Sequence, residues 1–233
     1  MGKGWKQSIK TAQAQKKGQA FTKLAREIAV AAKLGGADPE GNSRLKMAIV
    51  AAREASCPKD TIERAIRKGA GLDNDGSQIE ELTYEGLAPF GVGVIVECQT
   101  DNKNRTVSEL RNMFKRAGGS LGESGSCLWM FDRVCLVTGT KAGLGDPEEE
   151  AIEVNANSVE KNDDGSYSFY GALNDLDQMR ANLTARGWAV QAAERSYLAK
   201  NTTDLSEEQL KEVHELLEEI DGCDDSHRVH ATI

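Results

Sequence analysis

The sequence predicts a multidomain α+β protein, with helices at the N-terminus and mixed strands and helices after them. Its 233 residues exceed the length of about 100–150 residues that is typical of one domain. Apolar residues recur at helical spacing over the first seventy positions, and strand patterns alternate with helix patterns beyond position 80. The turn-rich segment 70–79 separates the two patterns and indicates a linker. No stretch approaches the roughly 18 apolar residues that a membrane span requires.

A first helix is predicted from Phe21, because apolar side chains recur there at helical spacing. Gly35-Gly36 supplies the residues that commonly end a helix. We expect residues 21–72 to form a bundle of three helices. Residues 1–20 are basic, carry Trp5 and lack a clear apolar period, so they are expected to form a flexible arm that holds at most a nascent helix, with a disordered, solvated tail as the alternative.

Two further helices complete the predicted bundle. One carries Leu45, Ala48, Ile49 and Ala52 on its inner face, and either Asn42 or Ser43 could cap it. The other begins at Pro58, a residue that suits a first turn, and ends at Gly69.

Beyond the linker, strands and helices follow in the order β-α-β twice over. The predicted strands are Val92–Cys98, Cys127–Phe131, Val134–Thr138, Ser166–Tyr170, Trp188–Leu198 and residues 228–233. The predicted helices are Arg105–Ala117, Pro147–Asn157, Asn174–Arg186 and residues 206–221, the last opening with a capping box. This order indicates two small ferredoxin-like sandwiches, the second inserted in the first. Residues 80–132 with 200–233 would form the outer domain, and residues 133–199 the inserted one.

Charge is segregated along the chain. Residues 1–71 hold fifteen Lys or Arg against six Asp or Glu, whereas the whole chain carries a net charge of −8. A basic segment on an acidic body indicates a local contact with phosphate, driven by the release of condensed counterions. The candidate nucleic-acid-binding residues are Lys3, Trp5, Lys6, Lys10, Lys16, Lys17, Lys23, Arg26, Arg64, Arg67, Lys68, Lys103 and Arg105. Trp5 could stack on an unpaired base or anchor packing, and the last two lie in the polar segment 100–106, where Asn104 could cap the next helix.

Other chemistries find little support in the sequence. Residues 118–125 are glycine-rich but follow a helix and contain an acidic residue, so a phosphate-binding loop is disfavoured. Cys223, His227 and His230 match no common zinc spacing, and no metal or other cofactor is expected. No nucleophile or acid–base motif indicates an enzyme. Five scattered cysteines without a close pair favour reduced thiols and a cytoplasmic protein.

A series of short motifs resembles the YebC/PmpR family. The matching residues are Phe21–Leu24, Arg26–Ile28, Ala31–Lys33, Gly35-Gly36, Asp38-Pro39, Pro58–Asp60, Ile62–Ile66, Tyr84–Gly86, Pro89, Val96–Cys98, Thr100–Asn102, Asn104–Thr106, Gly118-Gly119, Leu121-Gly122, Gly125-Ser126 and Trp129–Phe131. The arm departs from the family pattern, because Lys3-Gly4 stands where family members carry a histidine and a second arm histidine is also absent.

The resemblance implies three domains and a non-enzymatic regulator of gene expression. Family members are described as transcriptional regulators that bind DNA. Others, including a mitochondrial relative, act as ribosome-associated translation factors that ease difficult peptide synthesis. The implied partners are therefore DNA, or ribosomal RNA and the ribosome, with neither a membrane nor a small-molecule substrate.

Overall fold

The computed structural model describes residues 4–72, 79–143 and 145–233, with side chains from Lys17 onward. The chain divides into two compact units, Met1–Leu128 with Thr203–Ile233 and Trp129–Thr202. The first unit contains a helical module and a four-stranded sheet, and the second contains another four-stranded sheet. The α+β class predicted from the sequence is confirmed.

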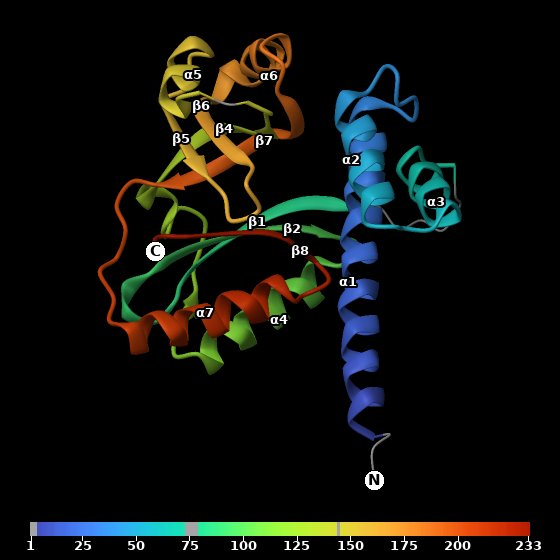
Figure 1. Ribbon diagram of the computed structural model, residues 1–233. Coiled ribbons are helices and arrows are strands. Elements are labelled where there is room, and N and C mark those ends of the chain that lie inside the picture. The colour runs from blue at the N-terminus through green and yellow to red at the C-terminus, as the bar shows by residue number, and fades with distance from the viewer. Residues whose placement is uncertain (1–3, 73–78, 144) are drawn as a thin grey trace. The chain divides into compact units, whose positions relative to one another are not determined.

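The helical module consists of α1 (Gly4–Gly35), α2 (Ser43–Glu54) and α3 (Lys59–Gly69) (Figure 1). Helix α1 begins at Gly4, well before the predicted start at Phe21, so the expectation of a flexible arm over residues 1–20 is wrong from Gly4 onward. The reason is propensity: Ala, Gln and Lys dominate residues 11–20, and all three favour helix without an apolar period. The core of the module includes fully buried Ile28, Leu45 and Ala52.

Asn42 joins the first two helices of the module. It is the N-cap of α2, where its side chain accepts a hydrogen bond from the Leu45 N–H at 3.1 Å. Its amide group donates to the carbonyls of Ala31 and Gly36, each at 2.8 Å. Gly36 has φ +89° and ends α1 in the left-handed conformation that favours glycine. Of the two predicted caps, the structure therefore selects Asn42 over Ser43.

The first sheet has the strand order β3-β1-β2-β8. Its strands are β1 (Glu80–Leu87), β2 (Gly93–Thr100), β3 (Ser120–Leu121) and β8 (Ser226–Ala231), and all paired neighbours are antiparallel. Helices α4 (Lys103–Arg116) and α7 (Glu207–Asp221) cover one face of this sheet (Figure 1). The core between them is built on Val94, Val96, Leu110, Phe114 and Ile220. The last helix and strand thus belong to the first sheet, although the second unit precedes them in the sequence.

The second unit has the order β4-α5-β5-β6-α6-β7. Its elements are β4 (Phe131–Thr140), α5 (Pro147–Glu153), β5 (Ser158–Lys161), β6 (Tyr167–Ala172), α6 (Leu176–Ala185) and β7 (Ala189–Ala199). The strand order β5-β6-β4-β7 is that of a ferredoxin-like sheet. Trp188 is buried in its core and meets the Phe169 ring edge-on, with 4.8 Å between centroids. The first sheet differs from the ferredoxin-like order, because its two central strands form the β1–β2 hairpin.

Several predicted elements need correction. Strand β1 was not predicted, because its glutamates and Gly86 interrupt the alternation of apolar residues from which a strand is predicted. Residues 127–131 were expected to form a strand, but Leu128–Met130 is a single 3-10 turn. Asn102, not Asn104, caps α4 by accepting from the Arg105 N–H at 3.1 Å. The predicted capping box of α7, Ser206 with Gln209, is confirmed.

Candidate nucleic-acid interface

The helical module presents its positive charge on two described surfaces. On α3, Arg64 and Arg67 are exposed and Lys68 is half-buried, and the Arg64 Nε donates to the Asp60 carbonyl at 3.2 Å. On α1, the Lys17 ammonium lies 5.4 Å from the centroid of the Phe21 ring. The side chains of Lys3, Trp5, Lys6, Lys10 and Lys16 lie outside the described residues.

Two candidate residues from distant parts of the chain meet at one carboxylate. Arg26 of α1 and Arg105 of α4 both bind Asp225, which lies in the turn between α7 and β8 and has a side chain only 2% exposed. Arg105 Nη2 lies 2.8 and 2.9 Å from the two carboxylate oxygens. Thr106 also donates to Asp225, at 2.7 Å, and Thr100 does so at 3.2 Å. The structure thus brings the N-terminal helix and the polar segment 100–106 together around a buried anion.

This arrangement gives Arg26 a structural role. Its guanidinium also donates to the backbone carbonyls of Gln99 at 3.0 Å and Asp224 at 2.6 Å, and its side chain is 17% exposed. Burial alone would raise the pKa of Asp225, but the hydrogen bonds from Thr106, Arg105 and Arg26 outweigh burial and hold that pKa below its usual value. Turning Arg26 outward to a phosphate would remove charge compensation from a buried carboxylate.

A second ion-pair network lies beside the first. Glu27 of α1 accepts two hydrogen bonds from the Arg44 guanidinium, at 2.7 and 3.0 Å, and one from Gln99 at 2.6 Å. Arg44 also reaches Glu81 of β1 at 2.6 Å. Burial alone would raise the pKa of Glu27, yet these contacts lower it. Neither Glu27 nor Asp225 was a candidate from sequence, because the partners of each are distant in the chain.

The remaining candidate lysines also have acidic partners. Lys23 forms an ion pair with Asp221 at 3.0 Å, and Lys103 pairs with Glu80 at 2.7 Å. The Lys103 side chain is 55% exposed, so this surface pair contributes little to stability. The structure therefore separates the candidates into an inner set around Asp225 and Asp221 and an outer set on α3 and at Lys17.

The glycine-rich loop 118–125 leads to an anion site that the protein fills itself. The Glu85 carboxylate, on β1, accepts hydrogen bonds from the backbone N–H groups of Gly125 at 2.7 Å, Cys127 at 2.9 Å and Leu128 at 2.8 Å. Burial would raise the pKa of Glu85, but these three donors lower it. The loop thus holds a carboxylate of the same chain where a phosphate loop would hold its ligand.

The C-terminal cysteine and histidines do not converge. Cys223 Sγ lies 3.5 Å from Glu109, His227 lies beside Glu27 at 3.4 Å, and His230 lies 3.0 Å from Glu97. No group of three or more potential metal ligands occurs among the residues that the structure describes. All five cysteines are buried as free thiols. Over the described part of the chain, no helix has both the length and the apolar character needed to cross a bilayer.

The fold and these contacts define a class: an α+β protein with a basic helical module and two four-stranded sheets. Residues 4–72 match the family model of the TACO1/YebC protein N-terminal domain, and residues 79–233 match that of the TACO1/YebC second and third domain. The chain therefore belongs to the TACO1/YebC family.

Relatives and a solved structure agree with this assignment. A protein of Bdellovibrio bacteriovorus called a probable transcriptional regulatory protein is 63% identical over 233 residues, all of both chains. One of the same name from Pseudomonas savastanoi is 45% identical, covering 99% of this chain and 98% of its own. The crystal structure of a conserved hypothetical protein from Aquifex aeolicus has a TM-score of 0.83 at 39% identity, covering 92% of this chain and 89% of that one.

Proposed function

We propose that this protein is a non-enzymatic, cytoplasmic regulator of gene expression that binds nucleic acid through its helical module. The observation that carries the proposal is the charge segregation. Fifteen basic residues lie in positions 1–71, the part of the chain that contains α1, α2 and α3, while the rest of the chain is acidic. Because phosphate is repelled by the acidic body, binding through the module would be local and oriented.

The proposed contact set follows from the outer candidates. It comprises Lys17, Arg64, Arg67 and Lys68, together with Lys3 and the α1 residues Trp5, Lys6, Lys10 and Lys16. Lys103 and Arg105 lie on exposed parts of the segment 100–106 and could add contacts at the margin. Arg26 is removed from the set, because it binds Asp225 with a side chain only 17% exposed, whereas Arg105 binds the same carboxylate with a side chain 41% exposed.

Duplex DNA is the first proposed target, since the relatives are named transcriptional regulatory proteins. Ribosomal RNA is the second, with the protein acting as a ribosome-associated translation factor that eases stalled peptide synthesis. The observation that favours RNA is the single basic module on a strongly acidic body, which suits docking at one point of a large folded RNA. Neither target requires a catalytic residue or a cofactor.

Charge reversal tests the binding surface. The double variant Lys16→Glu and Lys17→Glu should weaken binding to a DNA duplex and reduce the magnitude of the slope of log affinity against log salt by about 2, because each phosphate contact contributes about 0.9 to it. The control is Lys211→Glu, an exposed lysine on α7. Equal affinities and slopes for the double variant and the parent would refute the proposal.

Sedimentation separates the two targets. In a sucrose gradient of cell lysate, an RNA-directed protein should migrate with ribosomal particles, and the Lys16/Lys17 variant should return to the top fractions. A DNA-directed protein should migrate freely and shift promoter fragments with sequence preference. Free migration together with the absence of any DNA shift would contradict both targets.

A further inference from the structure

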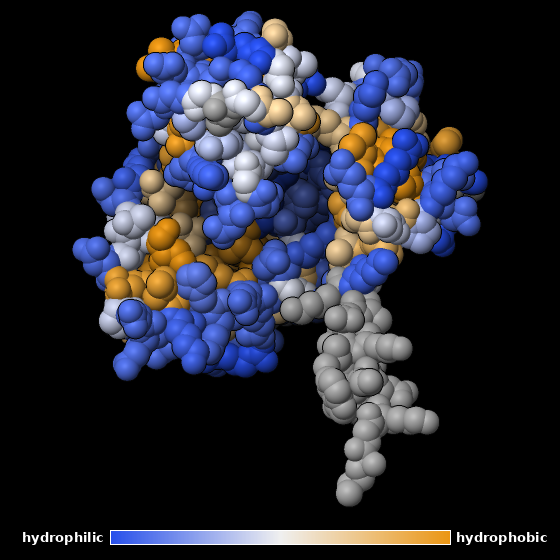
Figure 2. Space-filling view, viewed as in Figure 1, coloured by the Kyte–Doolittle hydropathy of each residue, from blue (hydrophilic) through white to orange (hydrophobic). Residues whose placement is uncertain are grey.

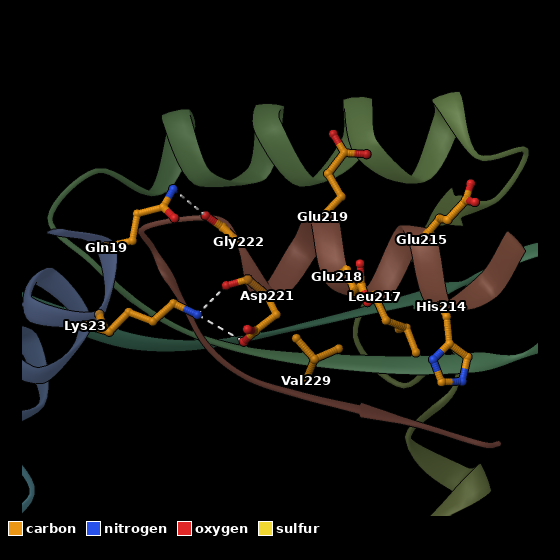
Figure 3. Close-up of a pocket in the computed structure, with 11 residues that line it drawn as sticks. Gln19, Lys23, His214, Glu215, Leu217, Glu218, Glu219, Asp221, Gly222 and Val229 are labelled. Carbon is orange, nitrogen blue, oxygen red and sulfur yellow. Dashed lines mark hydrogen bonds and ion pairs between the residues drawn. The ribbon is translucent and has the colours of Figure 1, made fainter. Parts of the chain in front are cut away.

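An open groove lies between α7 and the edge strand β8 of the first sheet. Its volume is about 940 Å³, and residues of α1, α7 and β8 line it. In Figure 3, His214 and Leu217 of α7 and Val229 of β8 point toward the same space. The ion pair between Lys23 and Asp221 closes one end, where Gln19 also donates to the Gly222 carbonyl at 3.2 Å.

One wall of the groove is a strand edge with unpaired backbone. Among the described residues, β8 pairs with β2 and with no other strand. Thr232, directly after β8, donates its N–H to the Gly93 carbonyl at 3.0 Å, so this N–H faces β2, while its carbonyl accepts from the Thr203 N–H at 2.7 Å. Because successive residues of a strand turn their N–H and C=O groups to opposite sides, those of Val229 and Ala231 face outward. The irregularity in pairing lies between Glu97 and Cys98, beyond this stretch.

The floor of the groove is apolar. Leu217 and Val229, which line it, are half-buried and pack against the core of the first sheet, as does Ala231 two residues further along β8. In Figure 2 an apolar area lies directly beside the hydrophilic outer face of α7. Edge strands of this kind, when bordered by apolar side chains, can accept an additional strand from another chain.

The other wall is acidic. Helix α7 carries seven Asp or Glu and a single Lys over its fifteen residues. Glu215 and Glu218 are exposed at the groove. This charge repels nucleic acid and attracts cations, so the groove cannot belong to the surface proposed for phosphate. An extended segment with alternate Lys or Arg could lay its aliphatic stems on Leu217 and Val229 and place its charged ends beside Glu218.

We propose that this groove binds an extended, basic peptide segment of a partner protein as an added strand on β8. The partner's backbone pairs with the outward groups of Val229 and Ala231, and its positive side chains face α7. The site thus joins a partner protein to the acidic body while the basic module remains available to nucleic acid. It goes beyond the proposed nucleic-acid contact and does not depend on it.

A designed peptide tests the proposal on the full-length protein. The probe is fluorescein-labelled Thr-Lys-Val-Lys-Thr-Lys, blocked at its C-terminus, and binding is followed by fluorescence anisotropy at low salt. We expect saturable binding and slower hydrogen exchange at the N–H groups of Val229 and Ala231. A peptide with Pro in place of its Val should bind at least tenfold more weakly, because it cannot complete the ladder.

Matched variants test the acidic wall. Glu218→Lys should weaken the peptide about tenfold, the effect expected for reversing one charge about 6 Å from another in water. Glu212→Lys makes the same change on α7 outside the groove and should have a smaller effect. Equal losses in the two variants, equal affinity for the Pro peptide, or unchanged exchange at Val229 and Ala231 would each overturn the proposal. If the protein self-associates and the peptide dissociates these oligomers, the open edge of β8 binds a second copy of the chain instead.

Discussion

Replacing Glu85 by Gln tests the site in which backbone N–H groups bind the Glu85 carboxylate, and it changes the shape of the side chain very little. Glu85 is 5% exposed, and its two carboxylate oxygens receive three backbone N–H groups. One oxygen faces Gly125, and the other faces Cys127 and Leu128. The amide of Gln has one oxygen, so its best orientation keeps two donors satisfied and turns an NH₂ group toward the third.

The magnitude follows from this count. The Gly125 N–H, in a contact that is only partly buried, loses its acceptor, which costs about 1 kcal/mol, and the two remaining bonds lose charge assistance, worth up to about 1 kcal/mol each. We therefore expect the free energy of unfolding to fall by up to about 3 kcal/mol at pH 7. The folded-state pKa of Glu85 lies below its unfolded value of about 4.5. Its contribution is thus fully present above that value and is lost as the pH falls through the folded pKa.

Urea denaturation followed by circular dichroism measures the difference at pH 7 and again at pH 4, where it should be smaller. Hydrogen exchange at Gly125, Cys127 and Leu128 provides the local measurement and should accelerate in the variant. The control is Glu123→Gln, an exposed carboxylate of the same loop, which should change stability by less than about 0.5 kcal/mol. Equal effects of the two substitutions at pH 7, or a difference that is the same at both pH values, would refute the reasoning.

Two further substitutions address how the helical module is held. Asp225→Asn should lower the free energy of unfolding of the first unit by about 2–3 kcal/mol. Breaking a buried ion pair costs about 3–5 kcal/mol. The cost is smaller here because Arg26 keeps two carbonyl acceptors and because water screens the charge of Arg105, which is 41% exposed. Limited proteolysis should cut the segment between α3 and β1 faster in this variant, and an unchanged rate would contradict the role of Asp225 in holding α1 through Arg26. Gly69→Ala should destabilise the module by about 1–3 kcal/mol in thermal unfolding, because an added Cβ would lie 2.1 Å from the Ala29 carbonyl oxygen. Gly18→Ala is the control and should be neutral or stabilising, because a Cβ added there would meet no other atom within 4 Å.

Local signals in the sequence predicted the elements whose stabilising contacts lie within a few residues along the chain. The capping box at Ser206, the glycines that end α1, and the apolar period of α4 each depend on neighbours within a few residues, so their outcomes agree with the structure. Strand β1 was missed because its stability comes from pairing with β2 and not from its own alternation. Residues 4–20 were expected to be an arm because they lack an apolar face, although their helix propensity was already visible.

The candidate site shows the same division. Charge counting located the basic module, since net charge is a sum over residues and needs no coordinates. It could not distinguish a lysine on a surface from an arginine that compensates a buried acid, because that distinction depends on Asp225, nearly 200 residues from Arg26.

By itself the sequence determined the α+β class, the basic N-terminal module and, through its motifs, the family resemblance. These properties are local or additive along the chain. Only the tertiary structure decided that Arg26 and Arg105 share Asp225, that Glu85 fills the glycine-rich loop, and that β8 leaves an open edge beside an acidic helix. Each of these depends on long-range pairing, which brings groups together regardless of their spacing in sequence.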